Sequence, residues 1–180
     1  MTSTTIYTLG HSTHPIDEFI GMLRVYAIER LVDVRTVPRS RHNPQFEQAS
    51  LSTSLPEAGI EYRHMKSLGG LRKTQADSVN NGWRNASFRG YADYMQTPDF
   101  AAAIDELIAL AGEKRTAVMC AEAVPWRCHR SLIGDALLVR GVAAIDIFSA
   151  TQSKPHALTS FAQVDGTKIT YPPPQPELPL

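Results

Sequence analysis

The sequence predicts an α/β fold: a single domain of three layers, with a mainly parallel sheet and helices on both faces. Three observations support this prediction. The chain has 180 residues, enough for one compact domain with a substantial core. Short apolar and β-branched runs alternate with helical segments, as in proteins built from right-handed crossovers between parallel strands. Glycine separates helix from strand three times, at Gly59, Gly112 and Gly141.

Five apolar runs are expected to form strands. They are residues 5–10, 30–35, 60–65, 116–121 and 144–149. Near the end of the chain, residues 164–171 are typical of a small hairpin, because Asp165-Gly166 suits a tight turn.

Four helices are expected between these strands. One begins at Pro15, and the others cover residues 47–58, 97–112 and roughly 127–140. The third of them has the clearest signals. Thr97 can cap it, Pro98 suits its first position, and Gly112 can end it in a left-handed conformation.

The remaining segments predict how the chain is organised. Residues 66–96 are less regular. Within them, residues 66–83 carry two glycine-containing stretches and are expected to form a long loop, which in a compact domain is usually functional or mobile. Residues 1–171 are expected to form the domain, and the Pro-rich residues 172–180 an extended tail.

Composition limits the classes of function. Eighteen basic residues balance eighteen acidic ones, so no overall positive field attracts nucleic acid or an anionic membrane. No apolar run approaches the roughly 20 residues that span a bilayer, and the start resembles no secretory signal. We therefore expect a cytoplasmic protein with free thiols. The sequence identifies neither a cofactor nor an oligomeric state.

Polar residues gather just beyond the carboxyl ends of four expected strands. In an open parallel sheet these ends meet in one crevice, where ligands bind. The residues concerned are Gly10, His11, Ser12, Arg35, Ser40, Arg41, His64, Gly69, Gly70, Arg72, Cys120, Glu122, Cys128, His129 and Arg130. The sequence thus predicts a functional site at this edge of the sheet.

The first three strand ends offer groups that suit an anion. Gly10 would let a ligand approach backbone amides at a helix N-terminus, although Ser12 could equally be a plain helix cap. Arg35 and Arg41 are candidates to bind phosphate or carboxylate, with Asp33 orienting a neighbouring arginine. The double glycine before Arg72 suits a flexible lid, although a solvated loop would look similar.

The fourth strand end, 120-CAEAVPWRCHR-130, holds both cysteines of the chain. If Cys128 lies in the first turn of a helix, the helix dipole and nearby arginines favour a reactive thiolate. Phosphatase and sulfurtransferase loops that cradle oxyanions also place a cysteine before an arginine-bearing helix, but their small residues contrast with Pro125 and Trp126 here. A zinc or iron site, a disulfide, and a buried ion pair between Glu122 and Arg130 are further alternatives.

The chain resembles the bacterial and archaeal family called domain of unknown function 488. The segments that carry the resemblance are 8-TLGHSTHPIDEFIGML-23, 31-LVDVRTVPRSRHNPQF-46, 59-GIEYRHMKSLGG-70, 87-SFRGYADYM-95, 120-CAEAVPWRCHR-130 and 155-PHALT-159. The resemblance implies a cytosolic α/β domain without an established reaction. It also draws attention to His156 and Thr159.

These observations lead to one main hypothesis and two alternatives. The main hypothesis is an enzyme-like protein that binds a small phosphate- or nucleotide-containing anion, with a thiol nucleophile or redox group and His11, His129 and Glu122 as proton-transfer candidates. Whether it is an enzyme stays open. The alternatives are a nucleic-acid-binding or regulatory module using residues 39–41, and a metal or thiol-redox sensor.

Overall fold

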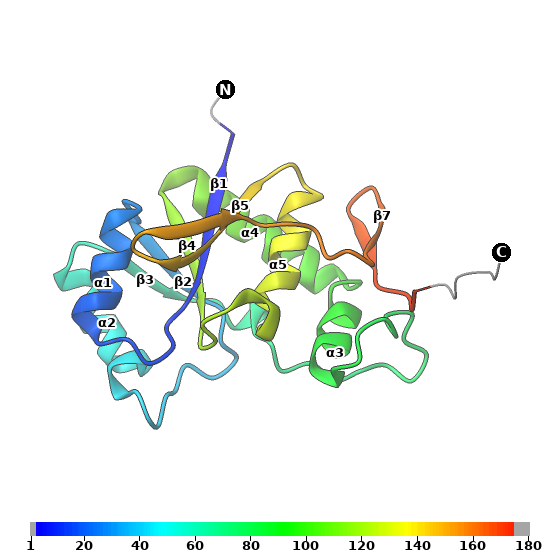
Figure 1. Ribbon diagram of the computed structural model, residues 1–180, viewed down its shortest axis with the longest axis horizontal. Coiled ribbons are helices and arrows are strands. Elements are labelled where there is room, and N and C mark those ends of the chain that lie inside the picture. Colours follow the sequence, from blue (N-terminus) through cyan, green and yellow to red (C-terminus); the bar gives the residue numbers. More distant parts are fainter. Residues whose placement is uncertain (1–2, 175–180) are drawn as a thin grey trace.

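The computed structural model describes residues 3–174 and confirms the predicted α/β fold (Figure 1). Among these residues, six strands form one sheet in the order β3-β2-β4-β1-β5-β6. The first five are parallel, and β6 is antiparallel to β5 at one edge. The strands are β1 (Thr5–Gly10), β2 (Arg30–Asp33), β3 (Glu61–His64), β4 (Thr116–Cys120), β5 (Ala143–Ser149) and β6 (Gln152–Pro155).

Helices cover both faces of the sheet, on either side of the strands in Figure 1. They are α1 (Ile16–Val25), α2 (Gln48–Glu57), α3 (Ala86–Tyr94), α4 (Pro98–Glu113) and α5 (Arg130–Leu138). Strand side chains alternate between two cores: Tyr7 and Leu9 pack with α1 and α2, whereas Ile6 packs with α3, α4 and α5. This alternation follows from the two-residue period of a strand.

Several helix ends follow the expected local rules. Thr97 accepts a hydrogen bond from the amide of Phe100 at 3.3 Å, and proline opens α4. Gly59 and Gly141 adopt φ values of +79° and +74°, which side chains rarely tolerate. The expected left-handed end at Gly112 is wrong, because α4 continues to Glu113.

Three sequence-based expectations need correction. The last helix begins at Arg130 rather than 127, because a separate 3₁₀ turn, Pro125–Arg127, precedes it. The expected loop over residues 66–83 contains a 3₁₀ turn (Lys66–Leu68), and the less regular segment after it contains α3, which Asn85 caps through its side chain. The antiparallel strand β6 was not expected.

The end of the chain agrees with the expectation as far as it is described. Strands β7 (Gln163–Asp165) and β8 (Lys168–Thr170) form the predicted hairpin, and Gly166 has a φ of +62°. Most of the expected tail, residues 175–180, lies outside the described residues. Within the described part of the chain, no helix has the length and apolar character needed to cross a membrane.

The winding direction of the chain reverses between two neighbouring strands. The connection after β1 runs through α1 on one face, and the connection after β4 runs through α5 on the other. Strands β1 and β4 are adjacent, so the direction of winding reverses between them. Ligands of doubly wound sheets bind at such switch points.

Candidate functional site

A cavity of about 340 Å³ lies at the carboxyl ends of β2 and β4. It contains six of the residues that the sequence predicted, which come from four separate segments of the chain. They are Arg35, Gly70, Cys120, Glu122, Cys128 and His129. We call this space the thiol cavity.

The two cysteines are free thiols and differ in acidity. Burial raises the pKa of Cys120, but a hydrogen bond from Cys128 and the positive charge of Arg130 outweigh it, so the net pKa is lowered. For Cys128, burial and the pairing with Cys120 raise the pKa well above the ordinary value. Cys120 is therefore the thiol that ionises first, and Cys128 is its proton-bearing neighbour.

His129 is held in one tautomer beside Cys128. Its Nε2 lies 2.9 Å from the carbonyl oxygen of Val34, to which it donates a hydrogen bond. Nδ1 is then an acceptor, 3.5 Å from the sulfur of Cys128. Burial lowers the pKa of His129 to about 4, so the ring is neutral at pH 7. Gly70 makes room for it, because a Cβ there would lie 2.5 Å from Nδ1.

Arg130 is completely buried and organises the loop between the cysteines. Its Nη2 donates to the carbonyl oxygens of Glu122 and Ala123, each at 3.1 Å, and its Nη1 donates to the hydroxyl of Thr8 at 3.4 Å. The expected ion pair with Glu122 is wrong, because Arg130 bonds the backbone of an exposed residue. Arg130 thus brings a positive charge near Cys120.

Arg35 is largely occupied by Asp33, as the sequence predicted. Its Nε and Nη2 donate to the two carboxylate oxygens of Asp33 at 2.9 and 2.7 Å. The hydroxyl of Tyr62 donates to the same carboxylate at 2.6 Å, which orients it further. A buried arginine paired in this way contributes less free charge to a ligand than an unpaired one.

His11 contacts Arg35 but does not line the thiol cavity. Its Nε2 is 3.4 Å from Nη1 of Arg35, and its ring stacks on Phe46 with a centroid distance of 4.3 Å. Burial lowers the pKa of His11, which keeps the ring neutral. The geometry makes His11 a residue that positions Arg35.

The expected anion seat at Gly10 is wrong. A Cβ at Gly10 would overlap the carbonyl oxygen of Glu122, so this glycine admits the neighbouring loop and not a ligand. The amides of His11 and Ser12 already donate to the carbonyls of Cys120 and Ala121, both at 2.9 Å.

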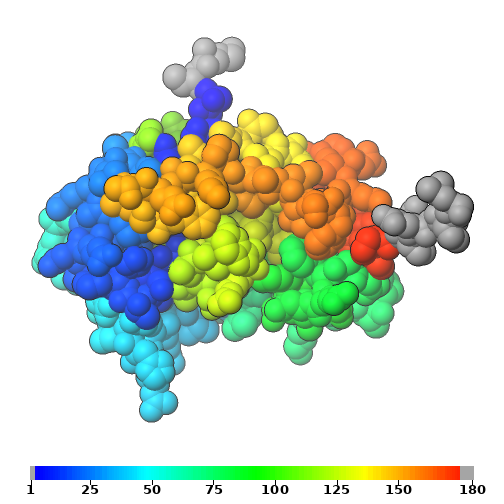
Figure 2. Space-filling view, viewed as in Figure 1, coloured from blue at the N-terminus to red at the C-terminus, as the bar shows by residue number. Residues whose placement is uncertain are grey.

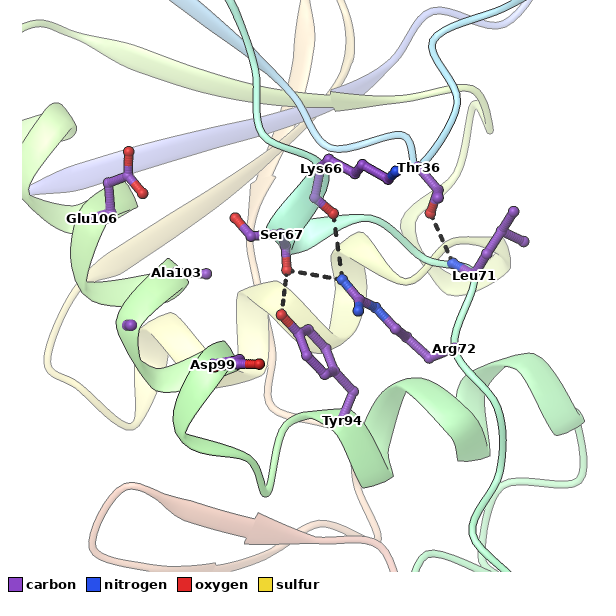
Figure 3. A pocket seen from close by; sticks show the side chains of 10 residues that line it. Thr36, Lys66, Ser67, Leu71, Arg72, Tyr94, Asp99, Ala103 and Glu106 are labelled. Carbon is purple, nitrogen blue, oxygen red and sulfur yellow. Dashed lines mark hydrogen bonds between the residues drawn. The ribbon is translucent and has the colours of Figure 1, made fainter.

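Arg72 and Gly69 belong to the wall beside the thiol cavity. Arg72 lines a second cavity of about 580 Å³ (Figure 3), where it donates to the carbonyls of Lys66 and Ser67 and lies over the ring of Tyr94. A Cβ at Gly69 would lie 2.5 Å from the hydroxyl of Thr36. The double glycine is thus required for close packing.

The remaining predicted residues lie outside the thiol cavity, and two others take their place. His64 donates from Nε2 to the carbonyl of Arg35 at 2.7 Å, and Ser40 donates its amide to Glu47. Arg41 is exposed and lines none of the cavities described here. Arg39 and Arg127 line the thiol cavity instead. Arg39 belongs to the arginine-rich segment after β2, and Arg127 belongs to the motif that contains both cysteines. The sequence of a motif does not show which of its arginines lines a cavity.

A second group of buried charges surrounds His156. Its Nδ1 and Nε2 lie 3.0 and 2.9 Å from carboxylate oxygens of Asp146 and Asp135. Burial lowers the pKa of His156, but these two carboxylates outweigh it and raise it to about 9. Asp135 also accepts hydrogen bonds from the Tyr171 hydroxyl and the Thr159 amide. The two late residues that the resemblance pointed to therefore belong to one network.

Within residues 3–174, no three His, Cys, Asp or Glu side chains are grouped as metal ligands would be. No curated protein and no solved structure matches the chain. The family described as "Domain of unknown function DUF488" matches residues 15–137, a segment that includes the whole thiol cavity. The chain therefore belongs to the DUF488 family.

Proposed function

We propose that this protein is a thiol enzyme that binds a small phosphate- or nucleotide-containing anion in the thiol cavity, with Cys120 as its nucleophile. One observation carries the proposal. The cavity holds two thiols whose pKa values are shifted in opposite directions, together with Arg35, Arg39 and Arg127. Nucleophilic cysteines are found in such electropositive surroundings, because positive charge stabilises the thiolate.

Arg39 and Arg127 bind the anion in this proposal. Neither guanidinium has an ion pair or a side-chain hydrogen bond among residues 3–174, whereas Arg35 is occupied by Asp33. An unpaired guanidinium can offer two parallel hydrogen bonds to a phosphate. Both side chains are exposed and come from different segments of the chain, so two independent segments offer a guanidinium to a ligand in the cavity.

The proton-transfer groups lie behind the nucleophile. Cys128 supplies the hydrogen bond that stabilises the thiolate of Cys120. Attack of this thiolate on a phosphate ester would form a sulfur–phosphorus bond, break the ester phosphorus–oxygen bond and release an alkoxide that takes a proton from water. The neutral Nδ1 of His129 can accept the proton of Cys128 whenever that second thiol must react. Glu122, exposed at the rim, can exchange protons with solvent.

A ligand screen by thermal shift tests this proposal. Phosphate, sulfate and nucleotides should raise the melting temperature of the wild-type protein. Arg39→Ala and Arg127→Ala should lose the stabilisation by phosphate and sulfate, whereas Arg41→Ala, a change in the same basic turn but outside the cavity, should keep it. If both cavity variants bind every hit as tightly as the wild type, the proposal is wrong.

A second candidate function is thiol redox sensing, which the pairing of the two cysteines favours. The disulfide-forming oxidant diamide would take two electrons and two protons from Cys120 and Cys128 and become a hydrazine, leaving one disulfide. Mass spectrometry should then show a loss of two hydrogens that dithiothreitol reverses and Cys128→Ser abolishes. Oxidation that yields only disulfides between molecules would contradict this function.

A further inference from the structure

A separate cavity of about 340 Å³ lies beside the His156 network. Its wall combines the 3₁₀ turn Pro125–Arg127, strand β5 and the segment that follows β6. In Figure 2 the yellow-green segment around residue 125 lies against the orange segment beyond residue 150. Both tryptophans of the chain, Trp83 and Trp126, contribute to this wall. We call it the aromatic cavity.

The aromatic side chains leave a ring surface open. Trp126 is 63% exposed, an unusual state for the largest apolar side chain. Its ring centroid lies 6.2 Å from that of Phe148, with 40° between the planes. Stacking on an exposed indole stabilises any planar ring, since every such ring has a π-face.

The polar groups of the cavity show which ring fits best. His156 is charged, but Asp135 and Asp146 flank it, so these three groups bind one another and not a ligand. Lys154, which also lines the cavity, has no ion pair among residues 3–174. Its free positive charge matches a negative group attached to the ring.

We propose that the aromatic cavity is a binding site for a planar heteroaromatic ring that carries an anionic group. A nucleoside monophosphate is the simplest ligand of this class. Its base would stack on Trp126, and its phosphate would pair with Lys154. A volume of about 340 Å³ is at the lower end of the range for small-molecule sites, which suits a single nucleotide and not a larger cofactor.

This site is independent of the proposed thiol function. Trp126 and Arg127 are neighbours in the chain, yet Trp126 lines the aromatic cavity and Arg127 the thiol cavity. A nucleotide could therefore bind at either place. The experiment must report on the two sites separately.

Tryptophan fluorescence reports on the aromatic cavity directly, because both indoles line it. Adenosine monophosphate, adenosine and inorganic phosphate should be titrated separately, with calorimetry to confirm each affinity. We expect the monophosphate to bind best, adenosine more weakly, and phosphate without a fluorescence change. Trp126→Ala should weaken the monophosphate about tenfold or more, because stacking on an aromatic side chain contributes this much. Trp126→Phe should restore most of the loss.

Further variants separate the contributions. Lys154→Ala should weaken the monophosphate but leave adenosine unchanged, whereas Arg41→Ala, a change outside both cavities, should alter neither affinity. Three results would overturn the proposal: no ring compound binds at millimolar concentration, Trp126→Ala binds as the wild type does, or monophosphate binding disappears in Arg39→Ala alone. The last result would place the nucleotide in the thiol cavity.

Discussion

Two buried histidines of this protein have opposite charge states. His129 faces a thiol and a backbone carbonyl, and burial holds its pKa at about 4. The side chain of His156 is also only 6% exposed, but two carboxylates raise its pKa to about 9. The difference shows that burial alone does not decide the protonation of a histidine. The neighbouring acceptors decide it.

The two surroundings also differ in how completely their polar groups are paired. Around His156, both ring nitrogens, both aspartates and the Tyr171 hydroxyl have partners within the protein. Around His129, two thiols and two unpaired arginines face an open cavity. We infer that the first group stabilises the fold and that the second is available for chemistry.

The largest expected effect would come from breaking the His156 network. Asp135→Ala would leave a buried imidazolium and the Tyr171 hydroxyl without a shared partner. Removing one partner of a buried ion pair costs about 3–5 kcal/mol, so we expect a loss of this size in urea unfolding. Cys128→Ser, a near-isosteric change in the thiol cavity, should cost much less. An equal loss in both variants would contradict the comparison.

The dependence of stability on pH should separate the two histidines. His156 has a raised pKa in the folded protein, so its contribution is complete below pH 6.5 and is lost as pH rises through about 9. His129 has a lowered pKa, so stability falls as pH decreases from 6.5 towards 4.

Chemical denaturation from pH 4 to 10 would measure both slopes. His156→Gln should remove the alkaline loss relative to the wild type and leave the acidic loss. His129→Gln should do the reverse. Identical alkaline slopes in the wild type and His156→Gln would show that His156 is not held as a cation.

A smaller effect is expected in the rates at which the two thiols are alkylated. Cys120 should react with iodoacetamide before Cys128 at pH 7, because its pKa is lowered while that of Cys128 is raised. Each pKa unit between them corresponds to about a tenfold difference in thiolate content. Peptide mapping would follow both sites, with urea-unfolded protein as the control in which the rates converge. Faster labelling of Cys128 would reverse their assigned roles.

The smallest effect is expected at Arg41. This side chain is exposed and lines neither the thiol cavity nor the aromatic cavity. Arg41→Ala should therefore change stability by about 0.5 kcal/mol or less, as is usual for surface substitutions. Calorimetric unfolding and the ligand screen would check this, and a loss of binding would extend the site into the loop.

The sequence predicted the sheet well because buried strands have a strong apolar pattern. It missed α3, whose cap Asn85 lies in a segment dominated by glycine and polar residues. It located the thiol cavity because topology brings strand ends together. The sequence did not show that Arg72 and Arg41 lie outside the thiol cavity, because the direction of a long side chain depends on tertiary partners such as Tyr94. The sequence also suggested that Gly10 contacts a ligand. The glycine instead makes room for the loop at Glu122, and such a contact between distant segments leaves no local pattern in the sequence.

Each of the two buried histidines lies against a glycine: His129 against Gly70, and His156 against Gly134, where a Cβ would lie 2.7 Å from the imidazole. A methyl group at either glycine must push one ring out of its place. Each glycine and its histidine should therefore behave as a single unit during evolution or protein engineering. A larger residue at Gly70 or Gly134 becomes acceptable only when the facing histidine is replaced by something smaller.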